Sequence, residues 1–94
     1  MQEPNEIAAY LGSLAAELRR RGLDAQVVAR SARPYVKAAN QRTPELNERV
    51  LCYRTDDQSL AFWWPWRQSI GPVDDLEAVA DKVAEVLRSV GNQP

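Results

Sequence analysis

Few side chains in this chain could support catalysis. Its 94 residues include one cysteine, Cys52, and no histidine. Without histidine there can be no Cys–His zinc site and no Ser–His or Cys–His pair to activate a nucleophile. Cys52 lies in the apolar run Val50-Leu51-Cys52-Tyr53, where a small buried side chain is expected. The alternative is a reactive thiol, which would need a neighbouring base or helix N-terminus to lower its pKa.

Two pairs of adjacent carboxylates could serve acid–base chemistry or metal binding. Asp74-Asp75 precedes a helical pattern, which makes it a helix cap, and Asp56-Asp57 lies in a polar segment typical of a turn. No third ligand follows either pair closely in the sequence. We therefore expect no metal, no cofactor and no enzymatic activity. The arginines at 19–21 could contact phosphate or anionic lipid, but the negative end of a helix dipole also explains them.

Two amphipathic helices are predicted, one near each end of the chain. In residues 5–21, Ile7, Leu11, Leu14 and Leu18 recur at steps of four, three and four residues. Gly22 follows as a C-terminal cap. The second helix starts after Asp74 or Asp75 and ends at Gly91. Its apolar stripe consists of Leu76, Val79, Ala80, Val83, Leu87 and Val90.

Between the helices, β-branched and aromatic residues alternate with turn signals. The predicted strands are Ala25–Ser31, Tyr35–Ala39, Arg49–Thr55 and Leu60–Trp64. Residues 40–48 are expected to form a loop or a single helical turn. The predicted fold is α+β, a single domain over residues 1–94 in the order α-β-β-β-β-α, with an antiparallel four-stranded sheet and both helices packed on one face. Residues 1–4 and 91–94 are expected to fray.

All three tryptophans and the one phenylalanine lie in the run LAFWWPW, residues 60–66. Successive strand side chains point to opposite faces, so Phe62 and Trp64 are expected in the core and Trp63 on the other side. Pro65 cannot donate a ladder hydrogen bond, so the strand either lies at a sheet edge or ends at Trp64. Trp66 is then left outside the core.

The side of the sheet away from the helices is predicted to combine aromatic and basic residues. The candidate binding residues, which include part of the segment from Trp63 to Pro72, are Arg30, Tyr35, Lys37, Tyr53, Trp63, Trp66 and Arg67. Such a set is typical of protein interfaces, although it could also stack bases or serve only as an amphipathic surface. We expect a non-enzymatic protein-interaction or regulatory accessory module that binds a protein partner or a second copy, as a homodimer. Nucleic-acid or small-ligand binding on the same face is the alternative.

Charge and hydropathy limit the cellular setting. Lys and Arg number 12 and Asp and Glu 13, so the net charge is −1 and no overall field attracts nucleic acid. The apolar runs are too short to cross a bilayer. The segment MQEPNE lacks the basic and apolar regions of a signal peptide, which favours a cytoplasmic location without membrane contact.

Three segments carry a resemblance to known sequences: RPYVKAAN (33–40), TPELNERVLCY (43–53) and WWPWRQSIGPVDD (63–75). Together they resemble small uncharacterised proteins of high-GC actinobacteria, over roughly residues 10 to 90. The resemblance implies a bacterial cytoplasmic accessory protein, loosely associated with genes for helix-turn-helix regulators, and it transfers no catalytic residues. The predicted architecture is also similar to secretion-chaperone-like binding domains, a likeness of fold that does not establish function.

Overall fold

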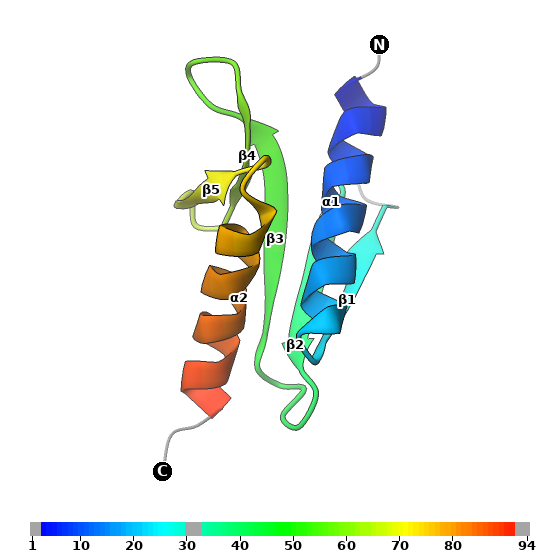
Figure 1. Ribbon diagram of the computed structural model, residues 1–94, viewed down its shortest axis with the longest axis vertical. Coiled ribbons are helices and arrows are strands. Elements are labelled where there is room, and N and C mark those ends of the chain that lie inside the picture. The colour runs from blue at the N-terminus through cyan, green and yellow to red at the C-terminus, as the bar shows by residue number, and fades with distance from the viewer. Residues whose placement is uncertain (1–2, 30–32, 92–94) are drawn as a thin grey trace.

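The computed structural model describes residues 3–29 and 33–91. Its elements are α1 (Glu3–Arg20), β1 (Leu23–Val28), β2 (Tyr35–Asn40), β3 (Asn47–Arg54), β4 (Leu60–Trp63), β5 (Ser69–Pro72) and α2 (Leu76–Gly91). Of the residues expected to fray, 3, 4 and 91 belong to helices, and the others lie outside the described ranges. Both helices lie on the same side of the sheet (Figure 1), with α1 packed mainly on β1 and α2 on β5.

Within the described residues, the sheet has five antiparallel strands in the order β1-β2-β3-β4-β5, so the prediction of four strands is wrong. The fifth strand, β5, pairs with β4 through Phe62↔Gly71 and Trp63↔Ser69, with a shift in register between Phe62 and Trp63. Its sequence, Ser-Ile-Gly-Pro, has one large apolar residue and two residues that are depleted in strands. Therefore it gives no alternation to detect. β4 is an interior strand that ends just before Trp64.

The boundaries of β1 also differ from the prediction. This strand begins at Leu23, directly after α1, and ends at Val28, whereas the predicted strand reached into residues 30–32, which lie outside the described ranges. Gly22 makes the immediate start possible, because its φ of 89° is accessible to glycine and its amide bonds the Arg19 carbonyl at 3.0 Å. The predicted C-terminal cap at Gly22 is confirmed.

One apolar core fills the space between the helices and the sheet. It contains Leu14 from α1, Val83 from α2 and Phe62 from β4, each 0% exposed. Trp64 is also buried in this core, whereas Trp63 is only half-buried and is not part of it. The predicted division of the tryptophan-rich run between two faces is therefore confirmed.

Two hairpin turns, Thr55–Ser59 and Trp64–Gln68, share one geometry. Each turn has five residues, and the amide of the first donates a hydrogen bond to the carbonyl of the fifth, with an N···O distance of 2.8 Å in both turns. The fourth amide also bonds the first carbonyl, at 3.0 and 3.1 Å. The fourth residue has a positive φ, 73° at Gln58 and 68° at Arg67, where glycine is usually found. Both turns therefore hold a side chain in a conformation that favours glycine.

The segment between β2 and β3 is a turn and not a helix. Asn40 organises it, because its Oδ1 accepts the amides of Arg42 (2.8 Å) and Thr43 (3.1 Å), the geometry of an Asx turn. The Leu46 amide then bonds the Thr43 carbonyl at 2.9 Å. Asn40 Nδ2 also donates to the Leu87 carbonyl at 3.4 Å. The turn is thus tied to α2.

The start of α2 follows closely on β5. The Val79 amide bonds the Asp75 carbonyl at 3.1 Å, so Asp75, rather than Asp74, is the residue that precedes the first helical turn. A Cβ added to Gly71 would lie 3.0 Å from Val79 Cγ2, which shows how closely the strand approaches the helix. Lys82 Nζ donates to the Ile70 carbonyl of β5 at 2.9 Å, and Arg19 makes the corresponding bond to the Ala25 carbonyl of β1 at 2.6 Å.

The arginines at the end of α1 have partners within the molecule. Arg20 pairs with Glu17 at 2.7 Å, and Arg21 bridges Glu17 at 3.0 Å and Asp81 of α2. The hydrogen bond from Arg21, together with the charges of Arg20 and Arg21, holds the pKa of Glu17 below its ordinary value. These contacts agree with a structural role for the arginines.

Candidate functional site

The face of the sheet away from the helices, here called the open face, is defined by strand pairing. The register aligns Gln26 with Lys37 and Arg49, and Val28 with Tyr35, Leu51 and Trp63. Tyr53 is paired with Ala61 on the same side. Ala61 is buried, with 3% of its surface exposed, although it is not part of the helix-side core. Side chains of the open face itself must therefore cover it. The open face therefore has a packed aromatic layer of its own.

Most of the candidate residues gather there. Tyr35, Lys37, Tyr53 and Trp63 share the open face by strand alternation. Arg67, in the turn after β4, lines a hollow on this face together with Tyr53 and Trp63. Arg30 lies outside the described residues.

Trp66 does not join this group. Its ring stacks on that of Trp64, with centroids 5.2 Å apart and an angle of 4° between the planes, and Trp64 belongs to the helix-side core. Trp66 Nε1 donates to Gln68 Oε1 at 2.9 Å. The prediction placed Trp66 with Trp63; in the structure the turn after β4 brings it to Trp64 instead, although it stays 53% exposed.

Two arginines that sequence reasoning missed complete the open face. The guanidinium of Arg49 lies 5.6 Å from the centroid of the Tyr35 ring, and that of Arg33 lies 5.5 Å from the Tyr53 ring. Arg49 could have been found from the sequence, because it stands four residues before Tyr53 in one strand and so faces the same side. Arg33 precedes β2 in the chain, and no periodic signal marks it.

Trp63 is held in place at the centre of the aromatic layer. Its Nε1 donates to the Tyr53 carbonyl at 3.3 Å, and the two rings have centroids 5.6 Å apart at an angle of 40°. Because hydrogen bond and ring contact act together, the indole has little rotational freedom. The open face thus presents a fixed aromatic wall with guanidinium groups over its tyrosines.

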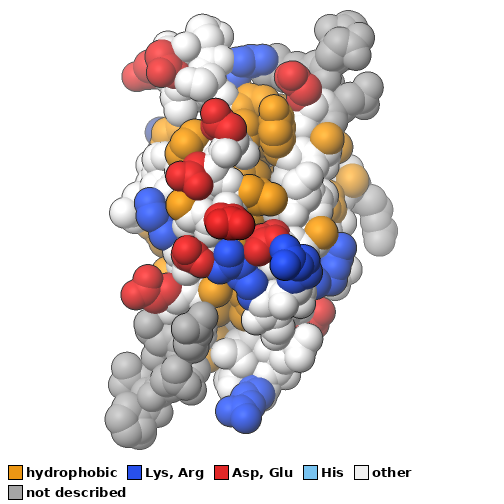
Figure 2. Space-filling view, in the orientation of Figure 1, with side chains coloured by type: hydrophobic (Ala, Val, Ile, Leu, Met, Phe, Trp, Pro, Cys, Tyr) orange, Lys and Arg blue, Asp and Glu red, His pale blue; other side chains and the backbone are white. Residues whose placement is uncertain are grey.

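Basic side chains gather on the strands of the open face. Lys37 and Arg49 lie on the open face, and the adjoining turns add Arg33 and Arg67. Among the described residues, Asp24 is the one acid that strand alternation places there. The acids on or beside the helices are Glu6, Glu17, Asp74, Asp75, Glu77, Asp81 and Glu85. Figure 2, which looks onto the helices, shows carboxylates and basic groups side by side on that face. On the strands of the open face the basic side chains therefore outnumber the acids, although Asp56 and Asp57 of the turn between β3 and β4 line a neighbouring hollow together with Trp63.

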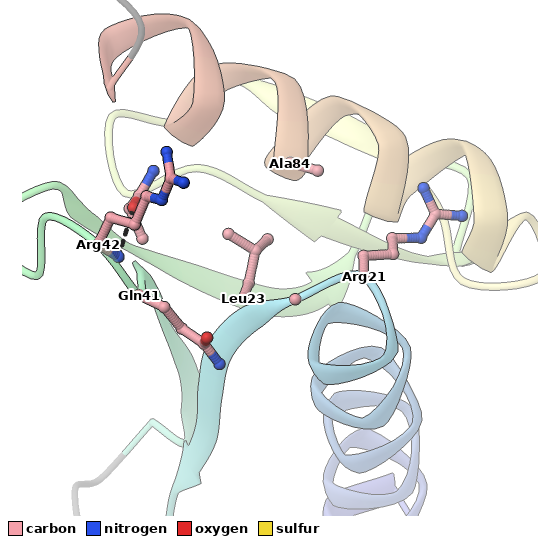
Figure 3. Close-up of a pocket in the computed structure, with 7 residues that line it drawn as sticks. Arg21, Leu23, Gln41, Arg42 and Ala84 are labelled. Carbon is pink, nitrogen blue, oxygen red and sulfur yellow. Dashed lines mark hydrogen bonds between the residues drawn. The ribbon is translucent and has the colours of Figure 1, made fainter.

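A second, smaller hollow of about 260 Å³ lies between the end of α1, the end of β2 and the middle of α2. Figure 3 shows Arg21 and Arg42 at its two ends, with Leu23 and Ala84 between them. Arg21 is already bonded to Glu17 and Asp81. This hollow therefore offers a single arginine, Arg42, for which no ion pair is recorded among the described residues.

Cys52 and Asp57, two of the residues considered for catalysis, lie in environments that indicate a structural role. Cys52 is 4% exposed, and burial raises the pKa of its thiol to about 11, opposite to the shift that a nucleophilic cysteine needs. Asp57 accepts bonds from the hydroxyls of Ser59 and Thr55 and from the Ser59 amide, which lowers its pKa to about 2. It closes the turn between β3 and β4, as predicted.

Comparison with known proteins found no matching family model, no matching curated protein and no matching solved structure. Within residues 3–29 and 33–91, neither helix is long and apolar enough to cross a membrane. In the same ranges, no cluster of three or more cysteine or carboxylate side chains could hold a metal ion.

Proposed function

We propose that this protein is a non-enzymatic interaction module whose open face binds an acidic segment of a protein partner. The observation that carries the proposal is the layer of tyrosines and Trp63 with guanidinium groups placed over the tyrosines. Trp, Tyr and Arg are the residues that contribute most to protein–protein binding. Arginine held on an aromatic ring loses less freedom when it pairs with a carboxylate, which favours binding.

The charge of the open face favours an acidic partner over a second copy. A symmetric dimer brings the same patch of both subunits together, so the basic patch that contains Lys37, Arg49 and Arg33 would face an identical basic patch. Like charges placed opposite each other across an interface cost several kcal/mol, on the order of a weak interface's whole affinity. Aspartate and glutamate side chains instead would pair with these groups.

The ring geometry favours a protein over a nucleic acid. Base stacking needs an accessible ring face, and Arg49 and Arg33 lie over the faces of Tyr35 and Tyr53. Trp63 is half-buried against Tyr53. A nucleic acid would have to displace the arginines before its bases could stack.

Selection of 12-residue peptides from a random library on the immobilised protein tests the proposal. Enrichment of Asp and Glu is expected, and affinity of the selected peptides should fall as salt is raised. Arg49→Glu should weaken their binding, whereas Arg20→Glu, the same charge change on the helix side at a position 76% exposed, should not. Two results contradict the proposal: selected peptides without acidic enrichment, or a 12-nucleotide single strand that binds more tightly than they do. A dimer by light scattering that Arg49→Glu strengthens would likewise favour self-association.

A further inference from the structure

Two neighbouring rows of side chains on the open face differ in their chemistry. One row is Lys37 and Arg49, which are paired across β2 and β3 and are both exposed. The next row along the same two strands is Tyr35 and Leu51, which are also paired and are both half-buried. In the described part of the chain, no ion pair is recorded for Lys37 or Arg49. The middle of the open face thus presents an apolar row directly beside two cations that can pair with carboxylates.

These rows offer a partner side chains and no backbone groups. The N–H and C=O groups of a sheet point toward the neighbouring strands, and β2 is paired with β1 on one side and with β3 on the other. An extended segment lying over the rows would hold its own N–H and C=O groups against an apolar layer without partners, which costs free energy. A helix pairs these groups internally. The rows therefore favour a helical segment over an extended one.

The spacing of the two rows matches a helix that runs along the strands. The rows are two residues apart, which is about 6.7 Å, and one helical turn rises about 5.4 Å, so residues on successive turns meet successive rows. With its side chains a helix is about 10 Å wide, enough to cover two strands that lie about 4.8 Å apart. On the opposite face, α1 and α2 run along the sheet rather than across it (Figure 1). A helix on the open face would add a layer of the same kind.

We infer that the partner segment is an amphipathic helix that lies along β2 and β3 on the open face. Its apolar residues contact Tyr35 and Leu51, and the acidic residues of the adjacent turn pair with Lys37 and Arg49. Trp63, which is aligned with Leu51 in the register, extends the apolar row beneath the side of the helix. The Arg49 guanidinium, held 5.6 Å from the centroid of the Tyr35 ring, lies where the apolar turn meets the acidic one. The inference rests on the proposed function and defines the conformation and residue pattern of the acidic segment.

Two peptides that differ only in their ability to form a helix test the conformation. The helical peptide has about 15 residues of alanine, leucine and glutamate, with leucines three and four residues apart and glutamates on the adjoining turn. In the second peptide a central alanine on the side away from the leucines is replaced by proline, which breaks the helix. Fluorescence anisotropy with the full chain should show at least roughly tenfold weaker binding of the proline peptide, and Cα chemical shifts of the bound, ¹³C-labelled helical peptide should be those of a helix. Equal affinities, or extended shifts in the complex, would overturn the inference.

Exchanging charges between the chain and the peptide tests the position of the helix. Lys37→Glu and Arg49→Glu should each weaken the helical peptide at least roughly fivefold, because carboxylates then face one another. A peptide with lysine in place of its glutamates should bind these two variants more tightly than the original peptide does. Arg20→Glu, on the helix side at a position 76% exposed, should leave both affinities nearly unchanged. An effect of Arg20→Glu equal to that of Lys37→Glu, or no recovery with the lysine peptide, would contradict the assigned rows.

The results also separate this inference from the proposed function. If acidic peptides are selected from the random library and depend on Arg49, but the helical peptide has no advantage over its proline variant, the proposed function stands and the helix is wrong. If neither designed peptide binds and the library shows no acidic enrichment, both are contradicted.

Discussion

Phe62 and Trp63 are neighbours in β4 whose side chains lie on opposite faces, so the same substitution should affect them very differently. Phe62 is 0% exposed at the centre of the core. Truncating a buried phenylalanine costs about 3–5 kcal/mol, and an unpaired buried ammonium adds several kcal/mol. Domains of this size are stable by about 5–15 kcal/mol. Phe62→Lys is therefore expected to leave the chain unfolded.

Trp63→Lys removes much less. It deletes the contact with the Tyr53 ring and the 3.3 Å bond to the Tyr53 carbonyl, each worth about 0.5–1.5 kcal/mol. The lysine ammonium can reach water from a half-buried position on the open face. The expected loss is about 1–3 kcal/mol, which leaves a folded protein.

Far-UV circular dichroism and urea unfolding separate these outcomes. Trp63→Lys should retain the wild-type spectrum and unfold cooperatively at a lower urea midpoint with an unchanged m-value. Phe62→Lys should show no cooperative transition. The reverse pattern, or two variants whose free energies of unfolding agree within about 1 kcal/mol, would refute the assignment of the two faces.

Three further outcomes follow from local contacts. Gly71→Ala should destabilise the fold by about 1–3 kcal/mol, because its Cβ would lie 3.0 Å from Val79 Cγ2. When Gly71→Ala is made in a Val79→Ala background, it should cost less free energy of unfolding. If the effects of the two substitutions are strictly additive, the contact is contradicted. Cys52, with its pKa raised to about 11 from a reference of 9.0, should react with a thiol reagent at pH 8 roughly 100-fold more slowly than a free cysteine; an ordinary rate in the folded chain would show that the thiol is accessible. Asp57→Asn should lower stability at pH 7, because the carboxylate has a depressed pKa in the folded state. Its stabilising effect is complete above about pH 4 and is lost as pH falls toward its folded pKa of about 2. Urea midpoints of both proteins should therefore converge over that interval, and a constant difference down to pH 2 would contradict the shift.

The helices and the division of β4 could be predicted because their signals are local. Leu11, Leu14 and Leu18 repeat on one helical face, and this is sufficient to identify α1 and its buried side. Likewise, alternation within a single strand separates Phe62 from Trp63 without any knowledge of the neighbouring strands. The end of α1 follows from one residue, Gly22, whose positive φ stops the helix.

The features that escaped prediction depend on contacts distant in sequence. β5 is too short to have a pattern, and it exists as a strand because β4 offers it a partner. Arg33 belongs to the open face because the strand register brings Tyr53 beside it. Trp66 was assigned from its nearness to Trp63, but the turn geometry at residues 64–68 carries its ring to Trp64. In each case the deciding quantity is a register or a turn, and side-chain type alone does not encode it.

The hydrogen bonds that Arg19 and Lys82 make to strand carbonyls affect how this sheet can meet other molecules. β1 and β5 are the outermost strands, and such strands are templates on which another chain can add a strand and begin aggregation. On β1 the Ala25 carbonyl is occupied by Arg19, and on β5 the Ile70 carbonyl is occupied by Lys82. Pro72 further removes an amide from β5. One hydrogen-bonding position on each border is thus already occupied within the molecule, which disfavours strand-by-strand growth between molecules at both edges of the sheet.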